Sequence, residues 1–228
     1  MDGNGRWASS CGLPRIAGHH AGAEALRAIV EAAPACSIGT LTAYAFSSDN
    51  WKRPMEEVDG LMELIADYLD GETPRLVAGG ARLSVIGRRD RLPERLLEAI
   101  RSAESATRGG TGLHFQLAID YSAREAILRA TQRSAGEPVT MERFEELLGQ
   151  SQPVDLLIRT GGEQRLSDFL LWECAYAELV FTKCMWPEFS PDELHKAVKE
   201  FHRRDRRFGT IPVGPQTQAF AGTDRWLR

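Results

Sequence analysis

The sequence lacks any run of about 20 apolar residues, the length that a helix needs to span a bilayer. It also lacks the basic and apolar regions of a secretory signal peptide near its start. Cysteine is scarce: four residues are scattered among 228, with no C-x-x-C spacing and no histidine partner at a metal-site spacing. We therefore expect a cytoplasmic protein with reduced cysteines, without a disulfide framework or a zinc site.

An excess of either charge is absent as well. The 28 Lys and Arg residues and the 32 Asp and Glu residues give a formal net charge of −4, so no nucleic acid partner is expected. One basic cluster lies at residues 202–207. We interpret it as the solvated end of a helix. The alternative is contact with a bound diphosphate or, peripherally, with the anionic inner face of the membrane.

What is present is the composition of one globular domain over residues 1–228, with 43% hydrophobic and 26% charged residues and a C-terminal tail at about 205–228. Apolar residues at helical spacing predict helices at 15–30, 58–76, 92–106, 122–134 and 140–149, from about Ser167, and at 191–206. β-Rich runs predict strands at 39–46, 82–87, 112–121, 155–158 and 178–181. Because strands and helices alternate, we predict an α/β fold with a central, mostly parallel sheet flanked by helices.

Three polar loops carry most of the candidate site residues. Loop 1–7 opens the chain, loop 47–54 follows the first predicted strand, and loop 159–165 follows the strand at 155–158. Loops at the carboxyl ends of parallel strands meet at one edge of the sheet, so we predict a shared cleft. Its predicted members are Asp2, Asn4, Arg6, Arg15, Asn50, Arg53, Arg159, Arg165 and Ser167. A guanidinium group can form two parallel hydrogen bonds to phosphate oxygens. The five arginines of this set exceed what one phosphate needs, and their charge suits two diphosphates.

Six segments carry a family resemblance. They are residues 2–8 (Asp-Gly-Asn-Gly-Arg-Trp-Ala), 15–22, 45–54 (Ala-Phe-Ser-Ser-Asp-Asn-Trp-Lys-Arg-Pro), 155–172, 175–179 and 206–209. In this order and spacing, the sequence resembles cis-prenyltransferases of the undecaprenyl diphosphate synthase (isoprenyl transferase) family over essentially its whole length. The resemblance implies a homodimeric transferase that condenses isopentenyl diphosphate onto an allylic diphosphate, usually farnesyl diphosphate. The expected product is a polyprenyl (undecaprenyl-type) diphosphate for a cell-wall carrier lipid.

The resemblance also implies roles for individual residues. The allylic diphosphate is expected at Gly3, Asn4, Gly5, Arg6, Trp7, Arg15, His19, Ser47, Trp51 and Arg53, and isopentenyl diphosphate at Arg159, Arg165 and Ser167. The expected catalytic residues are Asp2, Asn50 and Arg53. Mg²⁺ is expected on Asp2, with Glu178 as a second ligand that comes from the partner subunit or links the two sites. The base that removes the final proton stays open among Asp2, Asn50 and the departing diphosphate.

The growing product needs an apolar tunnel, because each five-carbon unit gains roughly 4 kcal/mol on leaving water, at about 0.8 kcal/mol per CH₂. By resemblance the tunnel lining includes Ala23, Ala45, Leu113 and Ile119. Ile119 stands where a smaller residue is expected in long-chain synthases, so a product shorter than about C55 is a further hypothesis. Purified enzyme that makes mainly C50 to C55 chains would contradict it.

Three other functions are alternatives to this interpretation. A short-chain cis-prenyl diphosphate synthase would use the same residues, whereas a non-catalytic partner subunit would be expected to lose the opening aspartate or the arginines. This chain keeps Asp2, Asn50, Arg53, Arg159 and Arg165. A phosphate-ester hydrolase would need a nucleophile beside a base, and the sequence shows no obvious pair of that kind.

Three departures from the family pattern remain. Residues 120–124 read Asp-Tyr-Ser-Ala-Arg in place of Asn-Tyr-Gly-Gly-Arg, and Asp168 stands where asparagine is usual; the added acid either weakens diphosphate binding or pairs with arginine. Relatives carry an apolar strand of about five residues before the opening aspartate, so the N-terminal strand of the sheet is expected to be missing here. Glu57, just after the second loop, is interpreted as a partner of an arginine or of Asn50.

Overall fold

The computed structural model describes residues 1–134, 138–149 and 152–204. The predicted tail at 205–228 and most of the basic cluster therefore lie outside the described residues. Within those ranges no helix combines the length and apolarity needed to cross a membrane.

The strands form two parallel sheets. In the larger one, β3 (His114–Tyr121) lies between β1 (Thr40–Ser47) and β2 (Arg82–Ile86). In the smaller one, β4 (Leu156–Arg159) pairs with β5 (Glu178–Phe181). Each of these strands lies within two residues of a predicted strand, which confirms the parallel α/β prediction. β3 is buried along most of its length because it has a strand on both sides.

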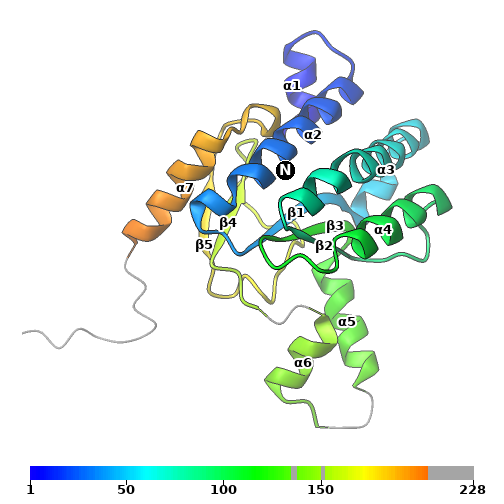
Figure 1. Cartoon of the computed structure of the whole chain (residues 1–228), viewed down its shortest axis with the longest axis vertical. Helices are drawn as coiled ribbons and strands as arrows, with labels where there is room; N and C mark the ends of the chain where they lie inside the picture. The colour runs from blue at the N-terminus through cyan, green and yellow to red at the C-terminus, as the bar shows by residue number, and fades with distance from the viewer. Residues whose placement is uncertain (135–137, 150–151, 205–228) are drawn as a thin grey trace, which may run out of the picture.

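Helices cover one face of the strands. They are α2 (Arg15–Ala32), α3 (Met55–Ala78), α4 (Glu94–Ala106) and α7 (Pro191–Arg203), while α5 (Ala123–Arg133) and α6 (Met141–Leu148) extend from the body as a hairpin (Figure 1). Phe115, Leu117 and Ile119 point from β3 into the core beneath these helices, since alternate residues of a strand share a face. Thr140 caps α6, because its hydroxyl accepts a hydrogen bond from the Arg143 main chain at 3.2 Å.

The helix predicted from about Ser167 is wrong. Ser167, Asp168 and Leu170 have positive φ angles of 49°, 62° and 45°, which a right-handed helix does not accommodate. The Asp168 carboxylate instead accepts hydrogen bonds from the Ser122 hydroxyl at 2.5 Å and the Arg124 main chain at 2.9 Å. These bonds hold residues 166–177 in turns that pack on the second face of the sheet. Leu170 is buried there.

The opening segment differs from the predicted loop because Asn4–Ser10 form a short helix, α1. α1 packs against α2 (Figure 1). Residues 4–7 of the predicted first loop therefore lie in a helix.

The described strands are divided between two sheets. Each of β1 and β4 pairs on one side only, and no other described strand bonds to their remaining edges. A cavity of about 1370 Å³ is lined by residues of both strands. The two sheets therefore stand in place of the single sheet that was predicted, because the hydrogen-bonding edges of β1 and β4 do not reach each other.

Candidate active site

The main chain of Asp2 is fixed at the carboxyl end of β4. The Thr160 hydroxyl accepts a hydrogen bond from the Asp2 amide and donates one to the Asp2 carbonyl, both at 2.9 Å. The Trp186 amide donates to the same carbonyl at 3.0 Å. Thr160 is only 1% exposed, so this anchor is shielded from water. Sequence reasoning missed Thr160, although its place directly after Arg159 in the third loop was a usable signal.

The Asp2 carboxylate faces two arginines. Arg159 donates a hydrogen bond to one oxygen at 3.0 Å, and Arg6 lies 3.4 Å from the other. Partial burial raises the pKa of the Asp2 carboxyl, but the hydrogen bond and charge of Arg159, helped by Arg6, outweigh it and hold the pKa below its ordinary value. Asp2 is therefore ionised at neutral pH.

Arg159 connects the first loop with the third. Besides binding Asp2, its guanidinium donates to the Ser167 hydroxyl at 2.8 Å and to the Arg165 carbonyl. Arg165 in turn contacts Glu163 at 2.5 Å. One side chain thus holds the opening aspartate next to the loop predicted to bind isopentenyl diphosphate.

Glu57 gathers three side chains of the predicted allylic site. The same carboxylate oxygen lies 3.1 Å from Arg15, 3.0 Å from Arg53 and 3.5 Å from the His19 ring. Burial raises the pKa of Glu57, but the arginine partners lower it by a larger amount. The net pKa lies below the ordinary value, so the carboxyl remains charged. Burial lowers the pKa of His19 below its ordinary value despite the nearby carboxylate, so the ring is neutral at pH 7. The interpretation of Glu57 as an arginine partner is confirmed.

The second loop presents its amide and its arginine in a fixed arrangement. Asn50 lies in the 3₁₀ turn η2 (Ser48–Lys52), where its side-chain oxygen accepts a hydrogen bond from the Ser47 amide at 3.1 Å.

Close packing constrains the first loop: a Cβ at Gly5 would lie 2.8 Å from the guanidinium of Arg15. Gly5 therefore lets Arg15 lie directly against α1.

The large cavity brings most of the predicted site residues together. It is lined by Asp2, Asn4, His19, Ser47, Asn50, Arg53, Arg159, Arg165 and Ser167. Seven other residues predicted to bind substrate or metal do not line it: Gly3, Gly5, Arg6, Trp7, Arg15, Trp51 and Glu178. Arg124 and Asp168 line it without having been predicted as site residues. Arg124 follows the carboxyl end of β3, so the rule that located the other loops would have found it.

The predicted tunnel residues separate into two pairs. Ala23 and Ala45 line a smaller cavity of about 70 Å³, and Ala45 lines the large cavity as well. Leu113 and Ile119 are buried in the main core and line neither cavity.

Glu178 lies at the opposite end of the β4–β5 pair from Asp2. It is level with Leu156, whereas Arg159 is level with Phe181, a separation of roughly 10 Å at about 3.3 Å per residue. Glu178 binds Arg204 at 2.7 Å. The part of the chain that the structure describes holds no group of three or more candidate metal-ligating side chains, so Asp2 and Glu178 of one chain do not form a ready-made metal site.

Comparisons with known proteins show the family to which this chain is related. A family model described as undecaprenyl diphosphate synthase (Prenyltransf) matches residues 1–209. The chain is 57% identical over 215 residues to isoprenyl transferase 1 of Bradyrhizobium diazoefficiens, covering 92% of this chain and 87% of that protein. It is 45% identical to a ditrans,polycis-undecaprenyl-diphosphate synthase, (2E,6E)-farnesyl-diphosphate specific, of Francisella tularensis, covering 92% and 85%.

A solved structure has the same fold. Lavandulyl diphosphate synthase from Lavandula x intermedia, in complex with dimethylallyl diphosphate, superposes with a TM-score of 0.89 at 36% identity and covers 92% of this chain and 95% of that one. The matching model spans nearly the whole chain, and the relatives keep a high identity over most of their own length. The chain therefore belongs to the undecaprenyl diphosphate synthase family of prenyltransferase enzymes.

Proposed function

We propose that this enzyme adds isopentenyl diphosphate to an allylic diphosphate, usually farnesyl diphosphate, and makes an undecaprenyl-type polyprenyl diphosphate for a carrier lipid. The observation that carries the proposal is the position of Arg159, which contacts both Asp2 and Ser167. A diphosphate at the first loop and another at the third would then lie side by side, as condensation requires.

The two diphosphates are assigned to opposite sides of Arg159. The allylic group lies toward Asn4, His19 and Arg53, and the isopentenyl group toward Arg165 and Ser167, all on the wall of the large cavity. Ionisation of the allylic C–O bond leaves negative charge on the departing diphosphate. Fixed cationic groups stabilise that charge, and Arg53 already has its position set by Glu57.

The residues present fit a divalent cation, with Mg²⁺ as the proposed ion. Mg²⁺ is usually held by one or two carboxylates together with phosphate oxygens, and Asp2 supplies one ionised carboxylate beside the proposed allylic site. When bound, the cation would neutralise charge on the diphosphate. Glu178 is too far along β5 to join Asp2 within one chain, so its proposed role as a second ligand requires the partner subunit.

The departing diphosphate is the proposed acceptor of the final proton. Asp2 has a pKa below its ordinary value, which makes it a weak base. The Asn50 oxygen is engaged by the Ser47 amide, and an amide is not a general base in any case. Both observations support diphosphate assistance over the two side chains.

The direct test incubates the protein with labelled isopentenyl diphosphate, farnesyl diphosphate and Mg²⁺, followed by sizing of the extracted lipid. Lipid near C55 supports the proposal, and no incorporation contradicts it. A second candidate is a short-chain synthase, favoured by the fold similarity to lavandulyl diphosphate synthase. Dimethylallyl diphosphate as the primer, with products of one or two added units, would identify that activity.

Arg165 offers a test of the isopentenyl site. Arg165→Met should raise the KM for isopentenyl diphosphate by about 10- to 100-fold and leave the KM for farnesyl diphosphate within about threefold, because one charged contact to a single substrate is lost. Arg143→Met is the matched control, since Arg143 is an exposed arginine on α6 that also pairs with a glutamate. An equal rise in both KM values would contradict the assignment.

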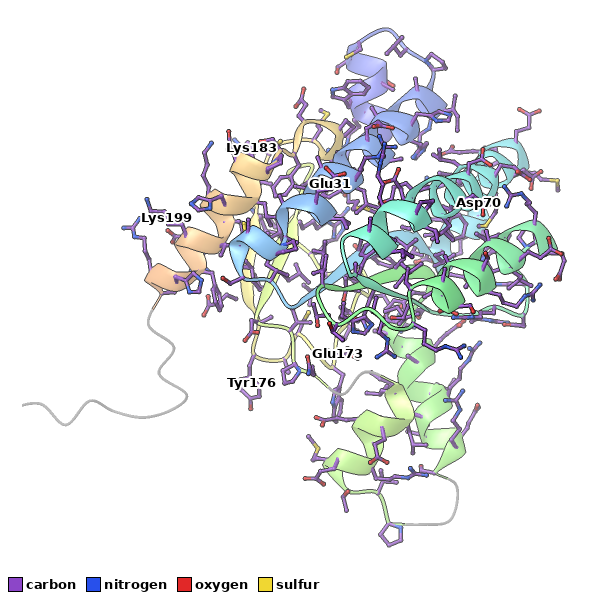
Figure 2. The ribbon with its side chains drawn as sticks, in the orientation of Figure 1. Glu31, Asp70, Glu173, Tyr176, Lys183 and Lys199 are labelled. Atoms are coloured by element: carbon purple, nitrogen blue, oxygen red, sulfur yellow. The ribbon has the colours of Figure 1, made fainter. Side chains whose placement is uncertain are left out.

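The homodimer and membrane contact remain predictions. Tyr176 points away from the body just before β5 (Figure 2). Its side chain is 80% exposed, and Leu179 on β5 is 37% exposed. These apolar groups beside an outer strand support a second copy as the partner, and sedimentation velocity measures it. Exposed Arg203 at the end of α7 supports peripheral contact with anionic lipid, which vesicle flotation measures.

A further inference from the structure

One buried carboxylate joins the ends of three neighbouring strands. Asp120, at the end of β3, is 0% exposed and accepts three hydrogen bonds. Two come from the Arg91 guanidinium at 2.6 Å each, and one comes from the Trp51 indole at 2.9 Å. Arg91 belongs to the loop after β2, and Trp51 belongs to η2 after β1. Asp120 stands where the family usually has asparagine, and Arg91 balances the added negative charge.

Trp51 is held from more than one direction. The Arg91 guanidinium lies over its ring at 5.1 Å from the centroid, a cation–π geometry. Phe46 meets the ring edge-on at 5.3 Å. With its N–H bonded to Asp120 as well, the indole has little freedom to turn.

The backbone beneath this cluster is equally close-packed. Gly87 has a φ of 116°, and a Cβ there would lie 2.0 Å from the Ile119 carbonyl oxygen. The next residue, Arg88, donates a main-chain hydrogen bond to the Asp120 carbonyl at 3.1 Å. Asp120 itself has a φ of 49°, a left-handed conformation that aspartate adopts more readily than most residues. The loop carrying Arg91 is therefore pressed onto the end of β3.

We propose that Asp120 is a positioning residue that orients Asn50 and Arg53 through Arg91 and Trp51; this inference rests on the proposed function. Asp120, Arg91 and Trp51 do not line the large cavity, whereas Asn50 and Arg53 do. Trp51 directly follows Asn50 and lies two residues before Arg53. Fixing the indole consequently fixes the turn that presents both groups to the substrates.

The geometry requires a carboxylate. The three donors use both oxygens of Asp120. A carboxamide has one acceptor oxygen, and its NH₂ group would face an N–H of Arg91. Asp120→Asn therefore leaves a donor without a partner and loosens Trp51, with little change in side-chain volume.

A neighbouring ion pair supplies a matched control. Arg89, in the same loop, binds Glu104 through two contacts of 2.6 and 3.0 Å, and so ties the loop to α4 and not to Trp51. If the Asp120 cluster only stabilised the fold, Glu104→Gln and Asp120→Asn would have similar effects on every measurement. If it positions the turn, only Asp120→Asn should affect the emission of Trp51 and the rate of reaction.

The test measures kcat, both KM values and the fluorescence of Trp51, taken as the difference from the same protein carrying Trp51→Phe. Asp120→Asn should lower kcat by about 10- to 100-fold, keep the KM for isopentenyl diphosphate within about threefold, and shift Trp51 emission to longer wavelength. Glu104→Gln should change none of these. Asp120→Asn combined with Arg91→Gln restores a neutral hydrogen-bonding pair and should recover part of kcat.

The outcomes separate this inference from the proposed function. An active wild type whose Asp120→Asn variant has the same kcat and Trp51 emission would overturn the positioning role alone. Equal losses of kcat in the Glu104→Gln and Asp120→Asn proteins would also overturn it, because the effect would then be one of general stability. A wild type without elongation activity would overturn the proposed function instead.

Discussion

Asp2→Ala should lower chain elongation by about 10²- to 10³-fold, because the substitution removes the one carboxylate that Arg159 and Arg6 hold beside the proposed diphosphate site. The main-chain bonds from Thr160 and Trp186 do not depend on the side chain, so the melting temperature should change little. Incorporation of labelled isopentenyl diphosphate, measured at several Mg²⁺ concentrations, tests both the rate and the proposed metal role.

Asp90→Ala is the control for Asp2→Ala. Asp90 is an exposed carboxylate that pairs with Arg88 at 2.6 Å and does not line the cavity. Its removal should leave elongation within about twofold, as expected for a surface ion pair. Full activity in the Asp2→Ala protein would exclude Asp2 from metal binding and from catalysis.

Five apolar residues fused ahead of Met1 should raise the melting temperature by about 10 °C. Met1 lies near the middle of the molecule (Figure 1), beside the free edges of β1 and β4. Asp2 is bonded to Thr160 at the carboxyl end of β4, so residues placed before Met1 would run parallel to β4. Such a strand would join the two sheets.

The expected gain follows from the energies of burial and pairing. Each large apolar side chain contributes about 1.5–3 kcal/mol and each main-chain hydrogen bond about 1 kcal/mol, against about 2 kcal/mol of conformational entropy per residue. For five residues these figures leave a net of roughly 3–10 kcal/mol, and the lower end of that range corresponds to about 10 °C for a chain of this size. A Gly-Ser extension of equal length is the control, since it buries little apolar surface. Equal melting temperatures for both extensions would contradict strand addition.

Local pattern explains why the strands and most helices were predictable. Runs such as Leu156–Arg159 and Glu178–Phe181 are short, apolar and bounded by polar residues, and each became a strand. The failure at Ser167 has an equally physical cause. Its segment has helical spacing, but bonds from Ser122 and Arg124 to Asp168 hold it in turns, and those partners lie more than 40 positions away in the sequence.

Local sequence was sufficient to predict the α/β alternation, the three polar loops and the family, because each depends on residues that are neighbours in the chain. The contacts that hold the site in place became visible only in the folded chain. Thr160 forms a hydrogen bond with Asp2, which is 158 positions away in the sequence. Asp120 accepts one from Trp51, which is 69 positions away. The division of the sheet was likewise decided by which strand edges meet in space. Contacts of this range depend on how the elements pack, and no local pattern specifies that packing.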